Sequence, residues 1–401
     1  MSILANTTNS ILNPDKNRIL RFFLRNTFYA QFCAGENGPE VRRTIRSLKD
    51  IGFGGVILGY AKEVVLTEAQ MKDLSSCGSG AAAEECIRNE IDPWATGTME
   101  TVLFASPGDY VALKFTGAGR QALYALSHRL PPTEALESAI DRICELAASR
   151  GVRLLLDAEQ QALQPGIDDW SLHFMRKYNS PDRAVVYGTY QAYLKATPAT
   201  LSRHLAAARE GGFALGVKLV RGAYLGSDPR HLIHDTKADT DAAYDGLAEA
   251  LLRRRWSAPL QPPSGEDAAT APFPAVGVVL ATHNRGSVRK AQGILLKARS
   301  TGAVVAEDVT FAQLQGMADE VSCELVATGG QAEGVAGGED KKVDKPRAYK
   351  YLVWGTTGEC MKYLLRRAYE NRDAVQRTRE GRDAMRAELL RRVKALFGLA
   401  K

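Results

Sequence analysis

The chain has little cysteine and histidine for its length, and neither type is grouped. Six cysteines and six histidines are spread over 401 residues without a CxxC pair, which favours neither a zinc site nor a disulfide framework. His231 and His234 stand at helical spacing, but without a Glu between them or a clear third ligand they predict no metal site. We therefore expect reduced thiols and no bound metal.

Long apolar runs and glycine-rich phosphate motifs are also missing. No stretch approaches the roughly 18 apolar residues that a membrane span needs. Neither GxGxxG nor GxxxxGK[ST] occurs, which counts against an open dinucleotide-binding sheet. Residues 1–25 contain arginines but lack the Ser-rich character of a transit peptide and the apolar core of a secretory signal, so no clear targeting segment is expected.

The excess of one charge sign is small. Lys plus Arg number 52 and Asp plus Glu 46, which gives a net charge of +6. This balance does not call for nucleic acid, and it fits an anionic ligand or cofactor equally well. Apolar residues at 45% and charged residues at 24% are ordinary globular values that exclude wholesale disorder.

The length points to two or three domains, unless the fold is an α/β barrel, which can exceed about 400 residues as one domain. Short apolar runs recur eight times, and their near-continuous apolar character is typical of parallel strands covered on both faces. The eight runs are residues 56–60, 110–117, 152–159, 184–193, 214–224, 275–284, 309–317 and 349–355.

Stretches of helical period separate these runs, and those at 39–52, 132–151 and 200–212 end in glycine, as helices that precede a strand often do. Eight such alternations predict an α/β protein built as a (β/α)₈ TIM barrel. The expected organisation is a helical extension over 1–45, the barrel over 46–380 and a C-terminal helix over 381–401. Proline-rich 257–274 and glycine-rich 329–345 are expected to be loop insertions, and 101–105 is ambiguous.

Charged residues stand inside or beside the apolar strand sequences. Lys114, Asp157 and Lys218 each interrupt such a run, and an unpaired buried charge costs several kcal/mol. These three residues therefore need partners, and one another is the obvious choice. Polar residues at the other strand ends, where barrel chemistry gathers, are Glu159, Tyr190, Gln191, Arg221, Tyr224, Thr282, His283, Asn284, Gln313, Gln315 and Tyr351.

A helix after the last strand run carries two adjacent arginines among apolar and aromatic neighbours. Arg366 and Arg367 lie four and three residues before Glu370, on a side from which it can pair with either. Two guanidinium groups in this setting form a fork suited to a carboxylate.

Together these residues predict a barrel enzyme that acts on a small carboxylate, and three interpretations remain open. One is a Schiff-base lyase with Lys114 or Lys218 as the nucleophile. Another is flavin-dependent oxidation, in which nearby cations stabilise the reduced, anionic ring. The third is a carboxylate-binding module without catalysis.

The motifs resemble those of the proline dehydrogenase family. Six motifs occur in that family's order and spacing over residues 50–380, namely LLLDAE, TYQAYLK, VKLVRGAYL, ATHN, FAQLQGM and YLLRRAYEN. The sequence around YLLRRAYEN looks most like the eukaryotic, fungal-type branch. The resemblance implies a distorted (β/α)₈ barrel whose last helix lies over the strand ends. It also implies non-covalent FAD, oxidation of L-proline to Δ1-pyrroline-5-carboxylate by hydride transfer to flavin N5, ubiquinone as acceptor, and a mitochondrial, matrix-side location in peripheral contact with the inner membrane.

The resemblance also implies roles for individual residues. Arg366, Arg367 and Lys114 would clamp the proline carboxylate, while Asp157 and Glu370 would fix these cations. The walls of the pocket would be Tyr224, Leu314 and Tyr351. Catalytic roles would fall to Lys114, Asp157, Lys218, Tyr224, Tyr351, Arg366, Arg367 and Glu370.

The cofactor contacts implied by the resemblance fall on five segments. They are Leu156 and Asp157; Gln191; Lys218, Arg221, Gly222 and Ala223; Thr282, His283 and Asn284; and, as weaker candidates, Thr236 and Lys237. Bacterial members commonly have arginine at the position of Lys218, and lysine keeps the charge without the planar fork.

Hydroxyproline dehydrogenase is the nearest rival within the family, and often has serine where this chain has Tyr351. A substrate hydroxyl would collide with the larger tyrosine, so the residue favours proline. The chain also lacks the aldehyde dehydrogenase and DNA-binding modules that some bacterial relatives fuse to this domain, and neither activity is expected.

Overall fold

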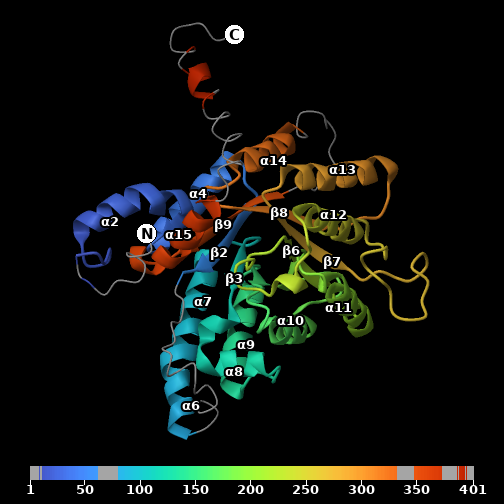
Figure 1. Ribbon diagram of the computed structural model, residues 1–401, viewed down its shortest axis with the longest axis horizontal. Helices are drawn as coiled ribbons and strands as arrows, with labels where there is room; N and C mark the ends of the chain where they lie inside the picture. The colour runs from blue at the N-terminus through green and yellow to red at the C-terminus, as the bar shows by residue number, and fades with distance from the viewer. Residues whose placement is uncertain are drawn as a thin grey trace.

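A computed structural model of the chain describes residues 9, 11–61, 80–331, 347–372, 386, 388–392 and 394. Its centre is a closed barrel of eight parallel strands, because β9 pairs with both β8 and β2 (Figure 1). The strands are β2 Gly55–Tyr60, β3 Tyr110–Leu113, β4 Arg153–Leu156, β5 Val186–Gln191, β6 Leu215–Val220, β7 Val276–Ala281, β8 Asp308–Leu314 and β9 Arg347–Trp354. The eight predicted strands and the TIM-barrel fold are thereby confirmed.

Helices surround the barrel (Figure 1). They are α4 Gly38–Ile51, α7 Asp92–Phe104, α8 Arg120–Ser127, α9 Glu134–Ser149, α10 Gln164–Tyr178, α11 Thr197–Gly211, α12 Lys237–Arg253, α13 Arg285–Thr301, α14 Asp319–Gln331 and α15 Thr357–Arg372. Shorter pieces are α6 Gly80–Cys86 and η3 Ile87–Ile91 ahead of α7, η4 Phe115–Ala118 and η5 Arg230–Leu232. The ambiguous stretch 101–105 therefore lies almost wholly within α7.

The chain ahead of α4 forms an N-terminal arm and a ninth, short strand. Helix α2 (Arg18–Leu24) runs through η1 (Arg25–Tyr29) into α3 (Ala30–Phe32), and β1 (Cys33–Gly35) follows. β1 pairs in parallel with Val353 and Trp354 of β9, whereas β8 pairs with β9 only up to Tyr351. β1 thus continues the sheet where β8 has ended.

The helix ends follow local chemistry. Asn37 caps the start of α4 by accepting from the amide of Glu40, and Gly52 ends the helix at φ 109°, a conformation that favours glycine. Thr236 and Asp239 form a reciprocal capping box at the start of α12. These caps satisfy backbone donors and acceptors that a helix end leaves unpaired.

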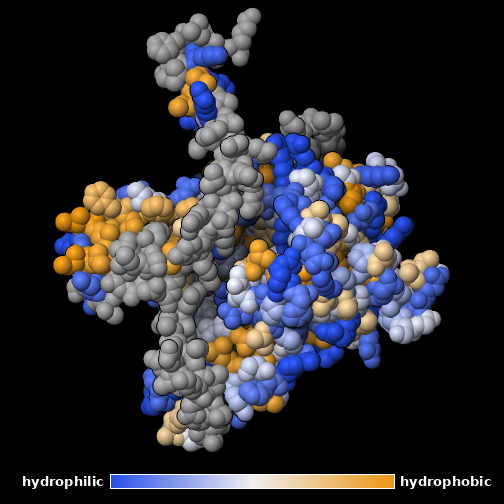
Figure 2. Space-filling model, in the orientation of Figure 1, coloured by the Kyte–Doolittle hydropathy of each residue, from blue (hydrophilic) through white to orange (hydrophobic). Residues whose placement is uncertain are grey.

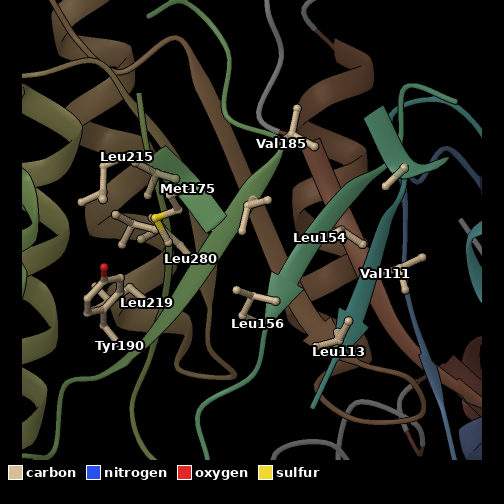
Figure 3. Packing of buried hydrophobic residues seen from close by; sticks show 14 of the residues in the cluster. Val111, Leu113, Leu154, Leu156, Met175, Val185, Tyr190, Leu215, Leu219 and Leu280 are labelled. Atoms are coloured by element: carbon tan, nitrogen blue, oxygen red, sulfur yellow. The ribbon is translucent and has the colours of Figure 1, made fainter. Parts of the chain in front are cut away.

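The strands are buried on both faces, which explains their near-continuous apolar sequences. One face packs against the helices, and its residues include Leu154, Leu156 and Leu219 (Figure 3). The other face fills the barrel with Tyr110 and Tyr187 among others. Leu156 thus points into the outer core, so the cofactor contact predicted for it could come only from its backbone.

The two predicted insertions differ in how far they can be checked. Within 257–274 the described secondary structure is a single bridge between Ser257 and Leu260. In 329–345 helix α14 continues to Gln331, and residues 332–345 lie outside the described residues. The five described cysteines are free thiols, namely Cys33, Cys86, Cys144, Cys323 and Cys360.

Candidate active site

Polar side chains converge at the C-terminal ends of the strands, as the sequence predicted. Alternation along each strand places Asp157, Gln191, Lys218 and Tyr351 on the same face as Tyr187, which fills the barrel. The strand register aligns Thr189 of β5 with Lys218 of β6. The upper end of the barrel is therefore polar, and its lower part is apolar and aromatic.

Asp157 and Lys218 form a buried ion pair. Lys218 Nζ lies 2.5 Å from Asp157 Oδ1, and the two side chains are only 7% and 11% exposed. Tyr351 donates its hydroxyl to Asp157 Oδ2 at 3.1 Å, and Lys218 Nζ lies 5.4 Å from the centre of the Tyr351 ring. The expectation that Lys218 and Asp157 satisfy each other is confirmed.

Lys114 belongs to a different part of the same end. No acid among the described residues, Asp157 included, lies within ion-pair distance of Lys114. The expectation that it pairs with Asp157 is thus wrong. The charge of Lys114 acts on Glu159. The Glu159 carboxylate accepts hydrogen bonds from the amide and the hydroxyl of Thr116. Burial raises the pKa of Glu159, and the charge of Lys114 partly opposes that rise.

The end of β5 carries polar atoms without a protein partner. Gln191 accepts the amide of Ala223 through Oε1 at 3.0 Å, which leaves its Nε2 buried and without a hydrogen bond among the described residues. Thr189 Oγ1, two residues earlier on the same face, is likewise buried and without a hydrogen bond among the described residues. Because buried polar atoms are normally bonded, these two fit a polar group of a bound molecule.

Arg221 organises a second cluster at the ends of β6 and β7. Its guanidinium lies 2.6 Å from Asp241, donates to Ser287 at 2.7 Å and to Thr282 at 3.2 Å, and stacks 4.6 Å from the ring of Tyr244. Asn284 joins the cluster by accepting from the Ser287 amide. Asp241 also binds Lys237, which sits beside the capping residue Thr236. The predicted outer cofactor residues are thus brought together.

The segment after β6 is held close to neighbouring loops. Gly222 has φ 155°, and a Cβ there would meet the Tyr193 ring at 2.4 Å, so close packing on this ring requires glycine. Tyr224 donates its hydroxyl to the carbonyl of Ala158 at 3.3 Å. Tyr193 donates to Asp228, which anchors the middle of the segment. His283, by contrast, faces β8, where its Nε2 accepts the amide of Leu314 at 3.1 Å.

Helix α15 covers one side of the strand ends. Its Met361 and Leu364 share an apolar cluster with Ala61 and Val353, which stand at the ends of β2 and β9, and Tyr351 packs against that cluster. The Arg367 guanidinium lies 5.2 Å from the ring of Tyr363. Arg366 and Glu370 belong to this helix, but their side chains lie outside the described residues.

Two residues that the sequence did not single out, Asp241 and Ser287, take part in these clusters, and a third, Glu159, was expected only as a polar residue at a strand end. Asp241 and Ser287 hold Arg221, and Glu159 faces Lys114. The signals for Asp241 and Ser287 are weak in sequence. Asp241 stands four residues after Lys237, the spacing of an ordinary helical ion pair, and Ser287 stands three after Asn284, at the third position of a helix start.

Two kinds of feature are absent from the described residues. No three His, Cys, Asp or Glu side chains gather where they could hold a metal ion. No described helix is long and apolar enough to cross a membrane.

Chemically, the strand ends can bind a small anion and position a second, larger group. Lys218 is neutralised by Asp157, whereas Lys114 keeps its charge for a ligand. The sequence model of the family described as proline dehydrogenase matches residues 41–380.

Relatives of two kinds are similar over most of the chain. A probable mitochondrial proline dehydrogenase of Schizosaccharomyces pombe is 29% identical, with 92% of this chain and 80% of that protein covered. A hydroxyproline dehydrogenase of Homo sapiens is 28% identical, with coverage of 94% and 83%. A mitochondrial proline dehydrogenase of Drosophila melanogaster is 31% identical, and the chain spans 50% of its length.

Among solved structures, proline utilization A from Bdellovibrio bacteriovorus has the same fold. It aligns with a TM-score of 0.65 at 18% identity over 92% of this chain and 36% of its own.

Proposed function

Because this chain belongs to the proline dehydrogenase family, we propose that it oxidises L-proline to Δ1-pyrroline-5-carboxylate with FAD as cofactor. The observation that carries the proposal is the group at the strand ends, where Lys218 is already neutralised by Asp157 and Lys114, after β3, has no ion-pair partner among the described residues. That arrangement provides a cation for a carboxylate without leaving a second buried charge unpaired.

The residues at the strand ends fit a flavin cofactor. Gln191 Nε2 and Thr189 Oγ1 are buried donors without partners among the described residues, and Lys218 stands next to Thr189 in the register. These residues would hold the ring, and the Arg221 cluster would hold the more distant part of the cofactor. When bound, FAD would supply the acceptor for a hydride.

The substrate would be fixed by its carboxylate. Arg366, Arg367 and Lys114 would bind it from two sides, one side being helix α15 and the other the end of β3. Tyr351, held by Asp157, and Tyr224 would limit the space around the ring. Oxidation removes a hydride from C5 and the proton from the amine nitrogen, which leaves a C=N bond. Fixed orientation of C5 is the contribution these residues make to the rate.

The electrons would pass to ubiquinone, and the enzyme would work in the mitochondrion. The proline dehydrogenases of Schizosaccharomyces pombe and Drosophila melanogaster support this location, because their names include the word mitochondrial. Contact with the inner membrane from the matrix side follows from a lipid-soluble acceptor.

The carboxylate clamp is tested by removing one guanidinium at a time. Arg366→Met and Arg367→Met are each expected to raise the KM for proline at least ~10-fold, about 1.4 kcal/mol. Arg299→Met, at an exposed position near the end of α13, is the matched control and should leave KM unchanged. An unchanged KM in both test variants would remove the clamp.

Hydroxyproline is the second candidate substrate, because relatives of both specificities are about equally similar. Tyr351 favours proline, and kcat/KM for proline should exceed that for trans-4-hydroxyproline. Tyr351→Ser should shift the ratio toward hydroxyproline. A wild-type preference for hydroxyproline would reverse the assignment, and a lysine adduct trapped by borohydride with substrate would instead favour the Schiff-base lyase.

A further inference from the structure

Large apolar side chains are concentrated on the outer face of the N-terminal arm. Six of the fourteen large exposed apolar side chains among the described residues fall between positions 11 and 28. Figure 2 shows them as a broad apolar area over α2 at the left of the molecule. We call this set the arm face: Ile11, Leu12, Ile19, Phe22, Phe23 and Phe28.

The arm face is built on a helix whose other side is firmly attached. Ile19, Phe22 and Phe23 are 72%, 64% and 62% exposed, and their spacing of three and four places them on one side of α2. Leu24 and Tyr29 are buried on the opposite side, where Tyr29 donates its hydroxyl to the carbonyl of Gly355 at 2.7 Å. The apolar residues therefore point outward because the helix is held in that orientation.

In the described part of the chain, the basic side chains without ion-pair partners around the arm face are Lys16 and Arg18, and the exposed carboxylate of Asp15 precedes them in the chain. Arg21 pairs with Glu36, and Arg25 pairs with Glu36 and Glu40, so these two arginines are balanced by two carboxylates. Lys16 and Arg18 are exposed, and neither has an ion-pair partner among the described residues. An apolar helix face bordered by unpaired cations complements a membrane surface that carries anionic lipid. A second copy of the chain would bring like charges together across a symmetric contact.

The arm is also attached to the helix that carries the proposed substrate clamp. Glu36 accepts from the amide and hydroxyl of Thr357, the first residue of α15, at 2.9 and 2.6 Å. Asp15 accepts the amide of Gly358 at 2.9 Å. A surface bound to the arm face would therefore lie next to α15.

From these observations we propose that the arm face is a membrane-docking surface, with Ile19, Phe22 and Phe23 entering the lipid and Lys16 and Arg18 contacting anionic headgroups. The proposal rests on the proposed function in one respect: a membrane-dissolved electron acceptor gives the docking its purpose. It names the surface through which the enzyme meets that acceptor.

The test is co-sedimentation with vesicles of phosphatidylcholine containing about one fifth phosphatidylglycerol. The triple variant Ile19→Ser, Phe22→Ser, Phe23→Ser is expected to bind at least ~10-fold more weakly, about 1.4 kcal/mol. The matched control is Leu103→Ser, Leu296→Ser, Val304→Ser, three exposed apolar residues on other elements, and it should bind like the wild type. Lys16→Glu with Arg18→Glu should abolish the preference for anionic over pure phosphatidylcholine vesicles.

Some outcomes would overturn the proposal, and one would assign the arm face to a second copy of the chain. Wild-type protein that does not sediment with vesicles, or a triple variant that binds equally well, would overturn the proposal. A wild type that is dimeric in solution and a triple variant that is monomeric would assign the face to a second copy instead. The variant Phe22→Leu, Phe23→Leu preserves an apolar face and should retain binding, which separates lost docking from lost folding.

Activity is measured separately with a water-soluble acceptor. The triple variant should oxidise proline at the wild-type rate in that assay and lose most of its rate with ubiquinone embedded in vesicles. A wild type that binds vesicles but does not oxidise proline would contradict the proposed function and leave the docking surface standing.

Discussion

Individual charges at the strand ends are tolerated because they are matched in pairs. Lys218 and Asp157 are both almost fully buried, and each is the partner of the other. Removal of one partner from such a pair costs about 3–5 kcal/mol, whereas removal of both can be nearly neutral. The pair thus offers a way to separate stability from function.

Lys218→Met is expected to lower the free energy of unfolding by about 3 kcal/mol, because it leaves the Asp157 carboxylate buried without its cation. The double variant Lys218→Met, Asp157→Asn should recover most of that loss, yet both proteins should be inactive with proline. Urea unfolding with a parallel activity assay measures the two effects. A double variant no more stable than the single one would show that the two residues do not act as a pair.

His204 is a single residue whose burial makes stability depend on pH. It lies beside Tyr190, with 2.8 Å between His204 Nδ1 and the Tyr190 hydroxyl oxygen. Burial lowers the pKa of His204 from 6.5 to about 4. In the unfolded chain His204 therefore binds a proton as the pH falls below about 6.5, whereas in the folded chain it binds one only near pH 4. Stability from the neutral ring is present above pH 6.5 and is lost as the pH falls through this window, by about 3 kcal/mol.

Comparison with His204→Gln isolates this contribution. Asp168, whose pKa burial raises to about 6, titrates in the same window with the opposite sign, but it is common to both proteins. The wild type should therefore lose more stability than the variant between pH 6.5 and pH 4.5, measured by urea unfolding at each pH. Parallel curves would show that His204 is protonated in the folded state as readily as in the unfolded one.

The partners of Asp157 and Lys114 show which single-residue contacts can be predicted from sequence and which cannot. A charge inside an apolar run predicts that a partner exists, and this identified Lys218 with Asp157. It could not predict that Tyr351 donates to the second oxygen of Asp157, or that Lys114 acts on Glu159 and not on Asp157 as an ion-pair partner. That choice depends on three strands meeting, and no local pattern records it.

At the scale of elements, glycine has opposite effects within one helix. Gly293 lies inside α13, and Gly302 caps its end at φ 68°; an added Cβ would meet nothing within 4 Å at either position. Only backbone conformation distinguishes them. Gly293→Ala should stabilise the protein by about 0.5–1 kcal/mol, and Gly302→Ala should destabilise it by about 1 kcal/mol.

Thermal unfolding of the two variants measures the difference. The same substitution at two open positions of one helix is its own control for the added methyl group. A shift of the same sign in both would mean that the end of α13 is not held in the left-handed conformation.

Elements also differ in how well sequence predicts them. The eight barrel strands were visible because burial on both faces makes their sequences apolar throughout. β1 was not visible, because three residues are too few to show a periodic pattern. It pairs with β9 only at Val353 and Trp354, beyond the point where β8 ends. Helix α7 was ambiguous at 101–105 because Thr98 and Thr101 are buried along with its apolar residues.

At the scale of the molecule, the barrel separates stability from chemistry. Its lower interior is closed by Tyr110, Tyr187 and the ion pair of Arg153 with Asp308, while the polar groups occupy the other end. The arm then joins the strand ends to an outward apolar face through α15. The proposed substrate site, the proposed cofactor residues and the proposed membrane-docking surface would thus lie toward one end of the fold, an arrangement suited to passing electrons from a polar substrate to a lipid-soluble acceptor.

The central claim, flavin-dependent oxidation of proline, is tested most directly by a visible spectrum of the purified protein under anaerobic conditions. A bound flavin predicts an absorption band at about 450 nm, and proline should bleach it while trans-4-hydroxyproline bleaches it more slowly. The control variant Arg299→Met should behave like the wild type, and Arg367→Met should need more proline. A protein loaded with FAD whose band proline leaves unchanged would contradict the account.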